Sequence, residues 1–220
     1  MLGLDPSTLI SYILVLLIAF PVHEFAHAWT ADRFGDKTPE INGRLTLNPF
    51  AHLDRLGSLM LVVDGFGWAK PVPVNPYVLR RHSAAALMWV SLAGPLSNLL
   101  LAVLAAIPFR IGLVSVTTAQ YDAYSGGAHL LPTLPQFLWI FLVTNLTLML
   151  FNLIPLAPLD GDKIADYLFP PPWARLWEKI RPYGPLILLA LLFVLPLFGV
   201  DIIGTVLTPL LTFLTQLLTG

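Results

Sequence analysis

The hydrophobic residues of this chain are gathered into long runs, and polar residues mostly lie between them. The apolar runs cover residues 8–30, 84–109, 134–155, 185–200 and 202–218. A helix needs about 20 residues to cross the hydrocarbon core of a bilayer, so the first three runs are long enough to span it. Pro196 and Gly199 separate the last two, and each of these is either a full span or one arm of a tilted hairpin. The pattern predicts four to five transmembrane helices.

Composition supports the same class of protein. The chain is 56% hydrophobic and 11% charged, with a mean hydropathy of +0.76, whereas a soluble domain has about 25% charged residues. It contains no cysteine, which excludes disulfides, thiolate metal sites and cysteine catalysis. The sequence has no run of basic residues that would indicate nucleic acid as a partner. We therefore expect an all-α polytopic protein embedded in a lipid bilayer.

The first run contains the pattern His23-Glu24-Phe25-Ala26-His27. Its mainly apolar part, Leu9–Val22, has only 14 residues, so it crosses a bilayer only if the pattern belongs to the same helix. Ionisable residues at membrane depth are costly and usually functional. No Lys or Arg precedes the run, and we expect a retained membrane helix and not a cleaved signal peptide.

The stretch between the first two long runs has a different character. Residues 41–48 and 68–75 alternate crudely, carry β-branched residues and are bounded by turn formers, which predicts two short strands. Leu56–Val63 is too short to cross and is interpreted as an interfacial or re-entrant segment. His52 is a candidate to orient site residues, although an interfacial hydrogen bond is the favoured interpretation.

The basic residues are distributed very unevenly. Of the 12 Lys and Arg residues, seven lie in Arg33–Arg81 and four in Lys163–Arg181, while Arg110 stands apart. Because Lys and Arg accumulate in cytoplasmic loops, residues 31–82 and 159–183 should face the cytoplasm.

Two histidines four residues apart lie on one face of a helix, where both can bind one zinc ion. His23 and His27 have this spacing, and Glu24 lies beside them. Zinc in catalytic sites lowers the pKa of bound water to about 7, and a carboxylate can then accept its proton. The alternative is an idle cluster of hydrogen-bonded histidines, which desolvation in a membrane helix makes expensive.

A catalytic zinc ion commonly has three protein ligands, and the best candidate for the third is Asp160. Pro155 and Pro158 should break the third long run before it, and Gly161 after it permits backbone angles closed to other residues. Irregular backbone at membrane depth is tolerated where protein buries it or where it lines a wet cavity. The alternative is an exposed aspartate at a helix end in the headgroup region.

Three asparagines in the long runs are candidates to support this site. Asn152 could bind the substrate backbone or a developing oxyanion. For Asn145 an interhelical hydrogen bond is at least as good an interpretation. Ser91, Gly94 and Asn98 share a small, partly polar helix face suited to close packing, and Asn98 is a further candidate to support the site.

Together these residues resemble the site-2 protease family of intramembrane zinc metalloproteases, in its compact prokaryotic branch without a PDZ domain. The two signature motifs of that family are matched by HEFAH at 23–27 and by Asn-x-x-Pro-x-x-Pro-Leu-Asp-Gly at 152–161, in that order. The segments GRLTLNPFAHLD at 43–54, GWAKPVPVNP at 67–76 and AGPLSN at 93–98 also match.

The resemblance implies one catalytic zinc ion bound by His23, His27 and Asp160, with Glu24 as catalytic acid and base and Asn152 positioning the substrate. It implies hydrolysis of peptide bonds in or near transmembrane segments of other membrane proteins, often in regulated signalling, and allows a regulatory membrane partner. The expected location is a prokaryotic cell membrane, with the active site towards the cytoplasmic side.

A membrane metal-binding or transport protein using the same His and Asp residues is the alternative function. Transporters commonly show repeated halves, and this sequence shows none. We expect a single integral-membrane metalloprotease domain over residues 1–220, with a catalytic core at about 8–165 and C-terminal helices at 173–218.

Overall fold

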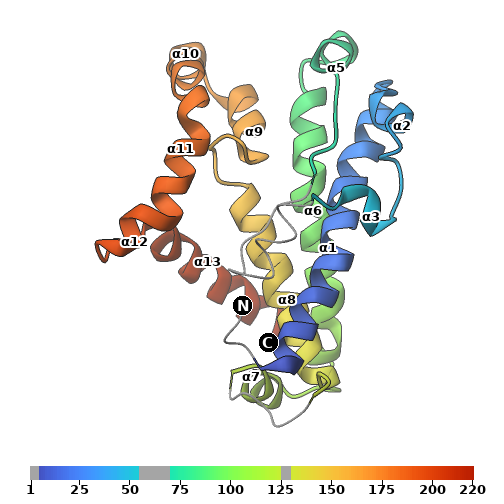
Figure 1. Ribbon diagram of the computed structural model, residues 1–220, viewed down its shortest axis with the longest axis vertical. Helices are drawn as coiled ribbons and strands as arrows, with labels where there is room; N and C mark the ends of the chain where they lie inside the picture. Colours follow the sequence, from blue (N-terminus) through green and yellow to red (C-terminus); the bar gives the residue numbers. More distant parts are fainter. Residues whose placement is uncertain (1–4, 55–69, 125–129) are drawn as a thin grey trace.

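The structure is a computed structural model that describes residues 5–54, 70–124 and 130–220. It is a bundle of helices in which α1, α6 and α8 lie side by side (Figure 1). Five helical segments are long and apolar enough to cross a membrane. They are Pro6–Arg33 (α1), Ala86–Arg110 (α6), Leu134–Asn152 (α8), Pro171–Leu197 (α10 to α12) and Ile202–Thr219 (α13).

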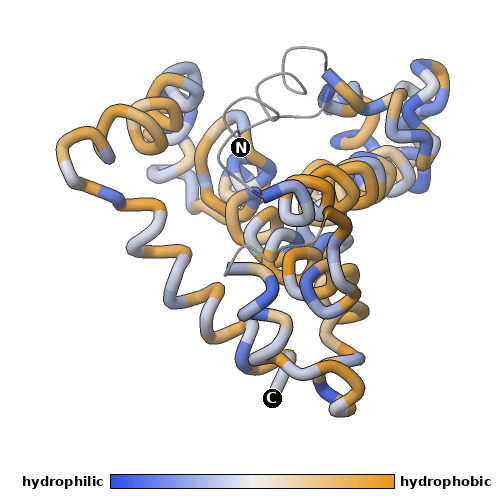
Figure 2. Tube along the Cα trace, turned by 60° about the horizontal axis from the view of Figure 1, so that its bottom comes forward, coloured by the Kyte–Doolittle hydropathy of each residue, from blue (hydrophilic) through white to orange (hydrophobic). Residues whose placement is uncertain are grey.

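Shorter helices lie at the two ends of the bundle. At one end are α2 (Thr38–Ile41), α5 (Pro76–His82), α9 (Gly161–Leu168) and α10 (Pro171–Ile180), while α7 (Val116–Tyr124) lies at the other (Figure 1). Polar residues gather mainly at these ends and in the connections, and apolar residues cover the long helices (Figure 2). The helices α5, α9 and α10 carry many of the basic residues, so both basic stretches reach the same end of the molecule.

The first span is one continuous helix that includes the His23–His27 pattern. Asp5 begins it, because its carboxylate accepts the Thr8 amide hydrogen at 3.1 Å, and Pro6 occupies a position that needs no amide donor. Gly35 turns the chain after its end with a φ of 83°. With 28 residues, α1 is about 42 Å long. It can therefore cross a hydrocarbon core of about 30 Å and still project beyond it.

The centre of the bundle is built where α6 packs against α8. Ala102 and Ala106 of α6 share a buried cluster with Leu142 and Leu146 of α8. Small side chains on one helix let the large side chains of the other approach its backbone. The helices α7 and α13 add apolar residues to the same cluster, which holds four elements together at one end of the bundle.

Gln136 joins the start of α8 to the start of α1. It belongs to a capping box with Thr133, in which each side chain accepts a hydrogen bond from the backbone amide of the other. Its Nε2 donates to Ser7 Oγ at 2.9 Å and to Thr8 Oγ1 at 3.0 Å. All three side chains are buried, so these bonds fix where α1 begins relative to α8.

The strand predicted over residues 41–48 is wrong. Ile41 is the last residue of the short helix α2, and Gly43 then turns the chain with a φ of 67°. Asn48 begins another short helix, α3 (Pro49–His52), by accepting the Phe50 amide hydrogen. The turn formers that were expected to bound a strand instead cap helices, and they leave no room for an extended run.

The second predicted strand, residues 68–75, is not supported either. Its described part, 70–75, forms neither helix nor strand. Pro71 and Pro73 have no amide hydrogen to donate to a β-ladder, which is the physical reason that no sheet forms here. The segment Leu56–Val63, interpreted above as interfacial or re-entrant, lies outside the described residues.

The C-terminal helices lie at the margin of the bundle. After α10 the chain continues without a gap through η1 (Arg181–Tyr183), α11 (Gly184–Leu189), the π-helical η2 (Ala190–Val194) and α12 (Leu195–Leu197). Only 11% of each of the last two apolar segments is buried, against 39% to 44% for α1, α6 and α8. Gly220 lies beside the Arg110 side chain at the end of α6, on the side of α7 (Figure 1). The chain from α10 to Gly220 therefore runs from one end of the bundle to the other.

Candidate active site

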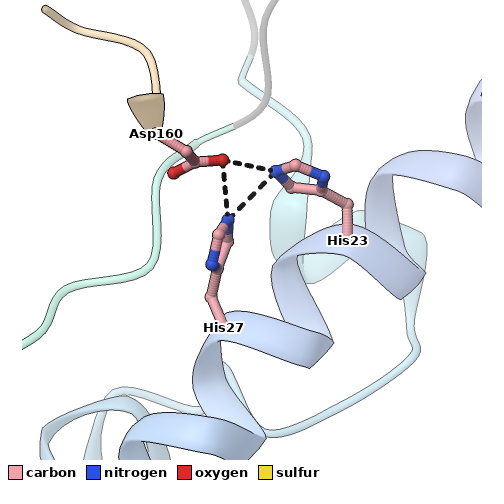
Figure 3. Close-up of side chains that lie close together, drawn as sticks. All are labelled: His23, His27 and Asp160. Atoms are coloured by element: carbon pink, nitrogen blue, oxygen red, sulfur yellow. Dashed lines mark hydrogen bonds and ion pairs between the residues drawn. The ribbon is translucent and has the colours of Figure 1, made fainter. Parts of the chain in front are cut away.

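Three side chains from distant parts of the chain converge on one point. His23 and His27 project from α1, and Asp160 lies directly before α9 (Figure 3). The two Nε2 atoms are 3.0 Å apart, and each lies 3.2 Å from Asp160 Oδ2. Both histidines are buried and Asp160 is partly buried. The geometry is that of a candidate metal centre.

The outer nitrogen of each imidazole is held by α6. His23 Nδ1 lies 2.6 Å from Asn98 Oδ1, and His27 Nδ1 lies 2.6 Å from the carbonyl oxygen of Val90. Both partners are acceptors, because Asn98 uses its Nδ2 to donate to Asn145 Oδ1 at 3.0 Å. Each Nδ1 therefore carries the proton, and each Nε2 directs a lone pair towards Asp160.

This arrangement fits a zinc ion. Two lone pairs and a carboxylate oxygen face one another, and no hydrogen-bond donor partners the buried Asp160 Oδ2. Such acceptors repel unless a cation lies between them. Ligands about 2.0–2.1 Å from a tetrahedral zinc are about 3.3 Å from one another, close to the separations found here. Two imidazoles and a carboxylate are ordinary zinc ligands and leave a fourth position open.

The break after α8 is what brings Asp160 to the histidines. The helix ends at Asn152, three residues before Pro155, as the prolines predict. Gly161 is required by space and not by a special φ. A Cβ at this position would collide with the carbonyl oxygens of Leu153 and Ile154, and its φ is not positive. The absent side chain lets the chain fold back tightly on itself.

Gly94 makes the close contact between α1 and α6 possible. A Cβ at Gly94 would lie 2.6 Å from His23 Cε1, and closer still to the His27 ring. The small face predicted around Ser91, Gly94 and Asn98 therefore packs against the two imidazoles. Asn98 lies on that face, is fully buried and contacts His23 directly.

The remaining sequence candidates lie at different distances from the cluster. Glu24 is buried on α1, and its Oε2 accepts the amide hydrogen of Val72 at 3.1 Å. Asn152 donates its Nδ2 to Leu148 O of its own helix, and in the described part of the chain no hydrogen bond joins it to the cluster. His52 is fully buried and bonds Thr46 O through Nε2 at 2.8 Å, and among the described residues no hydrogen bond joins it to His23 or His27.

The sequence reasoning did not identify Asp36 and Arg44 as buried charged residues. Asp36 and Arg44 are only 1% and 5% exposed, although both lie in a stretch that reads as an ordinary polar loop. Asp36 follows Gly35, which turns the chain after α1, and Arg44 follows the turn at Gly43. Their spacing in the sequence does not predict this burial, because their hydrogen-bond partners include backbone groups around residues 51, 70 and 75.

The fold and the cluster together define a helical membrane metalloprotein. The chain belongs to peptidase family M50, whose family model matches residues 11–195, and the resemblance to the site-2 proteases is confirmed. No solved structure matches the chain.

Curated relatives carry names of the same kind. The "Putative zinc metalloprotease YwhC" of Bacillus subtilis is 41% identical over 193 residues, which cover 87% of this chain and 84% of the relative. The "Putative zinc metalloprotease Rip2" of Mycolicibacterium smegmatis is 35% identical over 82% of this chain and 67% of its own length. Rip2 of Mycobacterium tuberculosis is 33% identical over 83% and 64%. Family and relatives support a zinc metallopeptidase and give no support to metal transport.

Proposed function

We propose that this protein is an intramembrane zinc endopeptidase that hydrolyses peptide bonds in or near transmembrane segments of other membrane proteins. The observation that carries the proposal is the convergence of His23, His27 and Asp160 on one point, inside a bundle whose helices are long and apolar enough to span a membrane. Membership of a peptidase family supports the reaction, and the apolar surface of the helices supports the bilayer as its setting.

His23, His27 and Asp160 would hold the zinc ion through Nε2, Nε2 and Oδ2. When bound, zinc supplies Lewis acidity that polarises a peptide carbonyl and activates water for attack. Glu24 is the general base in this mechanism. Its Oε2 is already occupied by the Val72 amide, which leaves Oε1 to accept the proton and later to return it to the leaving amine. Asn98 supports the site by holding the His23 ring.

A substrate that enters as a transmembrane helix has its backbone carbonyls already paired. It must therefore unwind locally before a carbonyl can reach the site. Asn152 lies partly buried at the end of α8, before the irregular segment that carries Asp160, and this location supports a role in binding such an unpaired backbone. We assign it a substrate-positioning role.

The proposed setting is a prokaryotic cell membrane with the site towards the cytoplasm. Two observations support this orientation. The basic residues of α5, α9 and α10 lie at one end of the bundle (Figure 1), and His23, Glu24 and His27 lie in the half of α1 nearer that end. Lys and Arg accumulate on the cytoplasmic side of membrane proteins.

The decisive experiment measures cleavage and bound zinc in purified protein reconstituted with a candidate membrane substrate. Glu24→Gln should retain zinc but lose about 10²- to 10⁴-fold in cleavage rate, because the amide cannot accept a proton. Asp160→Ala should lose zinc and cleavage together. Chelation should abolish cleavage by wild type, and added zinc should restore it. Glu178→Gln, an exposed glutamate on α10, is the matched control and should leave both properties unchanged.

Each half of the proposal can fail separately. Cleavage by Glu24→Gln at the wild-type rate would remove Glu24 from the mechanism. Cleavage by wild-type protein that holds no bound metal would contradict the proposed zinc site. Cleavage of soluble peptides with no activity towards membrane-spanning substrates would leave a zinc peptidase but contradict the proposed substrate class.

A further inference from the structure

Residues Lys70–Asn75 form a segment, here called the strap, that contacts α1 at Glu24, next to the candidate active site. Lys70 N donates to His52 O at 2.7 Å, and Lys70 O accepts from Arg44 at 3.4 Å. At the other end, Asn75 N donates to Asp36 Oδ2 at 2.6 Å. The strap is therefore held at both ends, at Lys70 through residues that follow α2 and at Asn75 through Asp36, which lies three residues after the end of α1.

The groups that hold the strap are unusually well buried. Asp36 is 1% exposed, Arg44 is 5% exposed and His52 is not exposed at all. Burying charged side chains carries a large desolvation penalty unless their hydrogen bonds are satisfied. Asp36 receives two backbone amides, from Thr38 and Asn75, and Arg44 binds the carbonyls of Ala51 and Lys70. The proposed reaction uses neither side chain directly.

The middle of the strap meets the proposed general base. Val72 N donates to Glu24 Oε2 at 3.1 Å. The residues on either side of Val72 are Pro71 and Pro73, which have no amide hydrogen. A slip of the strap by one residue in either direction would bring a proline to Glu24 and leave the carboxylate without its donor. The alternation of proline and valine thus fixes which amide reaches Glu24.

Two further features fix the course of the strap. A residue that precedes proline is restricted to extended backbone, and this applies to Lys70, Val72 and Asn75. The Val74 side chain packs against the buried cluster that contains Ala31 of α1 and Val90 of α6. Stiff backbone, an apolar contact and two polar attachments leave the Val72 amide little freedom to move.

We propose that the strap is a positioning element for Glu24, and that Asp36 and Arg44 are positioning residues that act on the reaction through the Val72 amide. This inference rests on the proposed function, in which Glu24 is the base. A glutamate side chain has several rotatable bonds, and proton transfer requires it to lie within hydrogen-bond reach of the reacting water. The amide restrains Oε2, so that Oε1 is presented in one orientation. Small displacements of a catalytic group can cost about 10²-fold in rate.

The test replaces the single N–H of Val72 by an oxygen. The α-hydroxy analogue of valine is incorporated at codon 72, and valine incorporated at the same codon by the same method is the control. The ester should lower kcat about 10- to 100-fold, the effect of losing one hydrogen bond to a charged group. KM for the membrane substrate and zinc affinity, measured by chelator competition, should stay unchanged, because the substitution touches neither a ligand nor the substrate.

A second variant tests the attachment. Asp36→Ala should lower kcat in the wild-type background but have little additional effect in the ester, since both changes interrupt the same path to Glu24. A purely structural role would instead give additive losses. Asp32→Ala, which removes a neighbouring aspartate paired with Lys37, is the matched control and should not change kcat.

Each outcome decides the inference. An unchanged kcat in the ester overturns it, and so does a loss of zinc, which would assign the strap to the metal centre. A raised kcat also overturns it and would make the strap an obstruction to the site. Glu24→Gln is assayed alongside: if it still cleaves, the proposed function fails, whereas an inactive Glu24→Gln with a fully active ester contradicts the strap alone.

Discussion

At the scale of single residues, the candidate metal centre depends as much on the partners of the imidazoles as on the imidazoles themselves. His23 and His27 can direct lone pairs at a metal only because Asn98 and the Val90 carbonyl accept the proton on the opposite nitrogen. The Asn98 amide is itself oriented by Asn145. A chain of three polar side chains thus fixes one tautomer of His23 in a buried place where water cannot substitute for a missing partner.

Asn98→Ala should weaken zinc binding about 10- to 100-fold, the usual effect of removing a hydrogen-bond partner of a metal-binding histidine. The measurement is chelator competition on the purified protein. Asn152→Ala is the matched comparison, since Asn152 bonds its own helix, and it should raise KM while leaving zinc affinity unchanged. Equal zinc affinity in wild type and Asn98→Ala would show that the tautomer of His23 does not depend on this contact.

At the scale of elements, α1 is positioned from both directions. Its first turn is bound to the start of α8 through Gln136, and the residue after its C-terminal turn, Asp36, binds the strap. The site lies between these two attachments. Because α1 carries His23, Glu24 and His27 on a single rigid helix, a shift of α1 along its axis would move all three relative to Asp160.

Gln136→Leu should destabilise the protein by about 1–3 kcal/mol, because Ser7 and Thr8 keep buried hydroxyls and lose a shared donor. The midpoint of thermal aggregation in detergent micelles is the readout. Gln136→Glu keeps an acceptor for the capping box but removes the Nε2 donor, so it separates the interhelical bonds from the cap. Gln120→Leu, at an exposed position of α7, should change the midpoint little. If Gln120→Leu lowered the midpoint by a similar amount, the effect would come from the added apolar side chain and not from the lost interhelical hydrogen bonds.

At the scale of the whole molecule, the C-terminal third decides how often the chain crosses the membrane. Five helical segments are long enough to span it, and five full crossings would return Gly220 to the side of α10. The structure instead ends α13 beside Arg110, next to a hollow of about 450 Å³ lined by α7, α8 and α13. We therefore expect one net crossing of the membrane between α10 and Gly220.

The natural chain has no cysteine, so single cysteines report their own location without background. Gly220→Cys should react with a membrane-impermeant thiol reagent added outside intact cells, and Lys179→Cys, exposed on α10, should react only after the membrane is opened. Opposite sides for the two cysteines are expected from one net crossing. Labelling of both from the same side would contradict the described path of α11 to α13.

The sequence by itself determined the class of this protein and the identity of its candidate zinc-binding residues. These features depend on local properties: apolar runs of spanning length, histidines four residues apart, and a helix broken by Pro155 before Asp160. The sequence also predicted the small helix face around Gly94, but it did not predict that two imidazoles would pack against this face.

The tertiary structure alone decided the rest. It replaced the two predicted strands by short helices and the strap, because Gly43 turned out to follow a helix and the prolines at 71 and 73 can supply no ladder bonds. It revealed Asp36 and Arg44 as buried groups, and it brought the Val72 amide to Glu24. These bonds join residues that are distant along the chain, and many of them involve backbone atoms, which every residue possesses. The pattern of side chains along the sequence therefore cannot predict these hydrogen bonds. Only the folded path of the chain determines which backbone group meets which side chain.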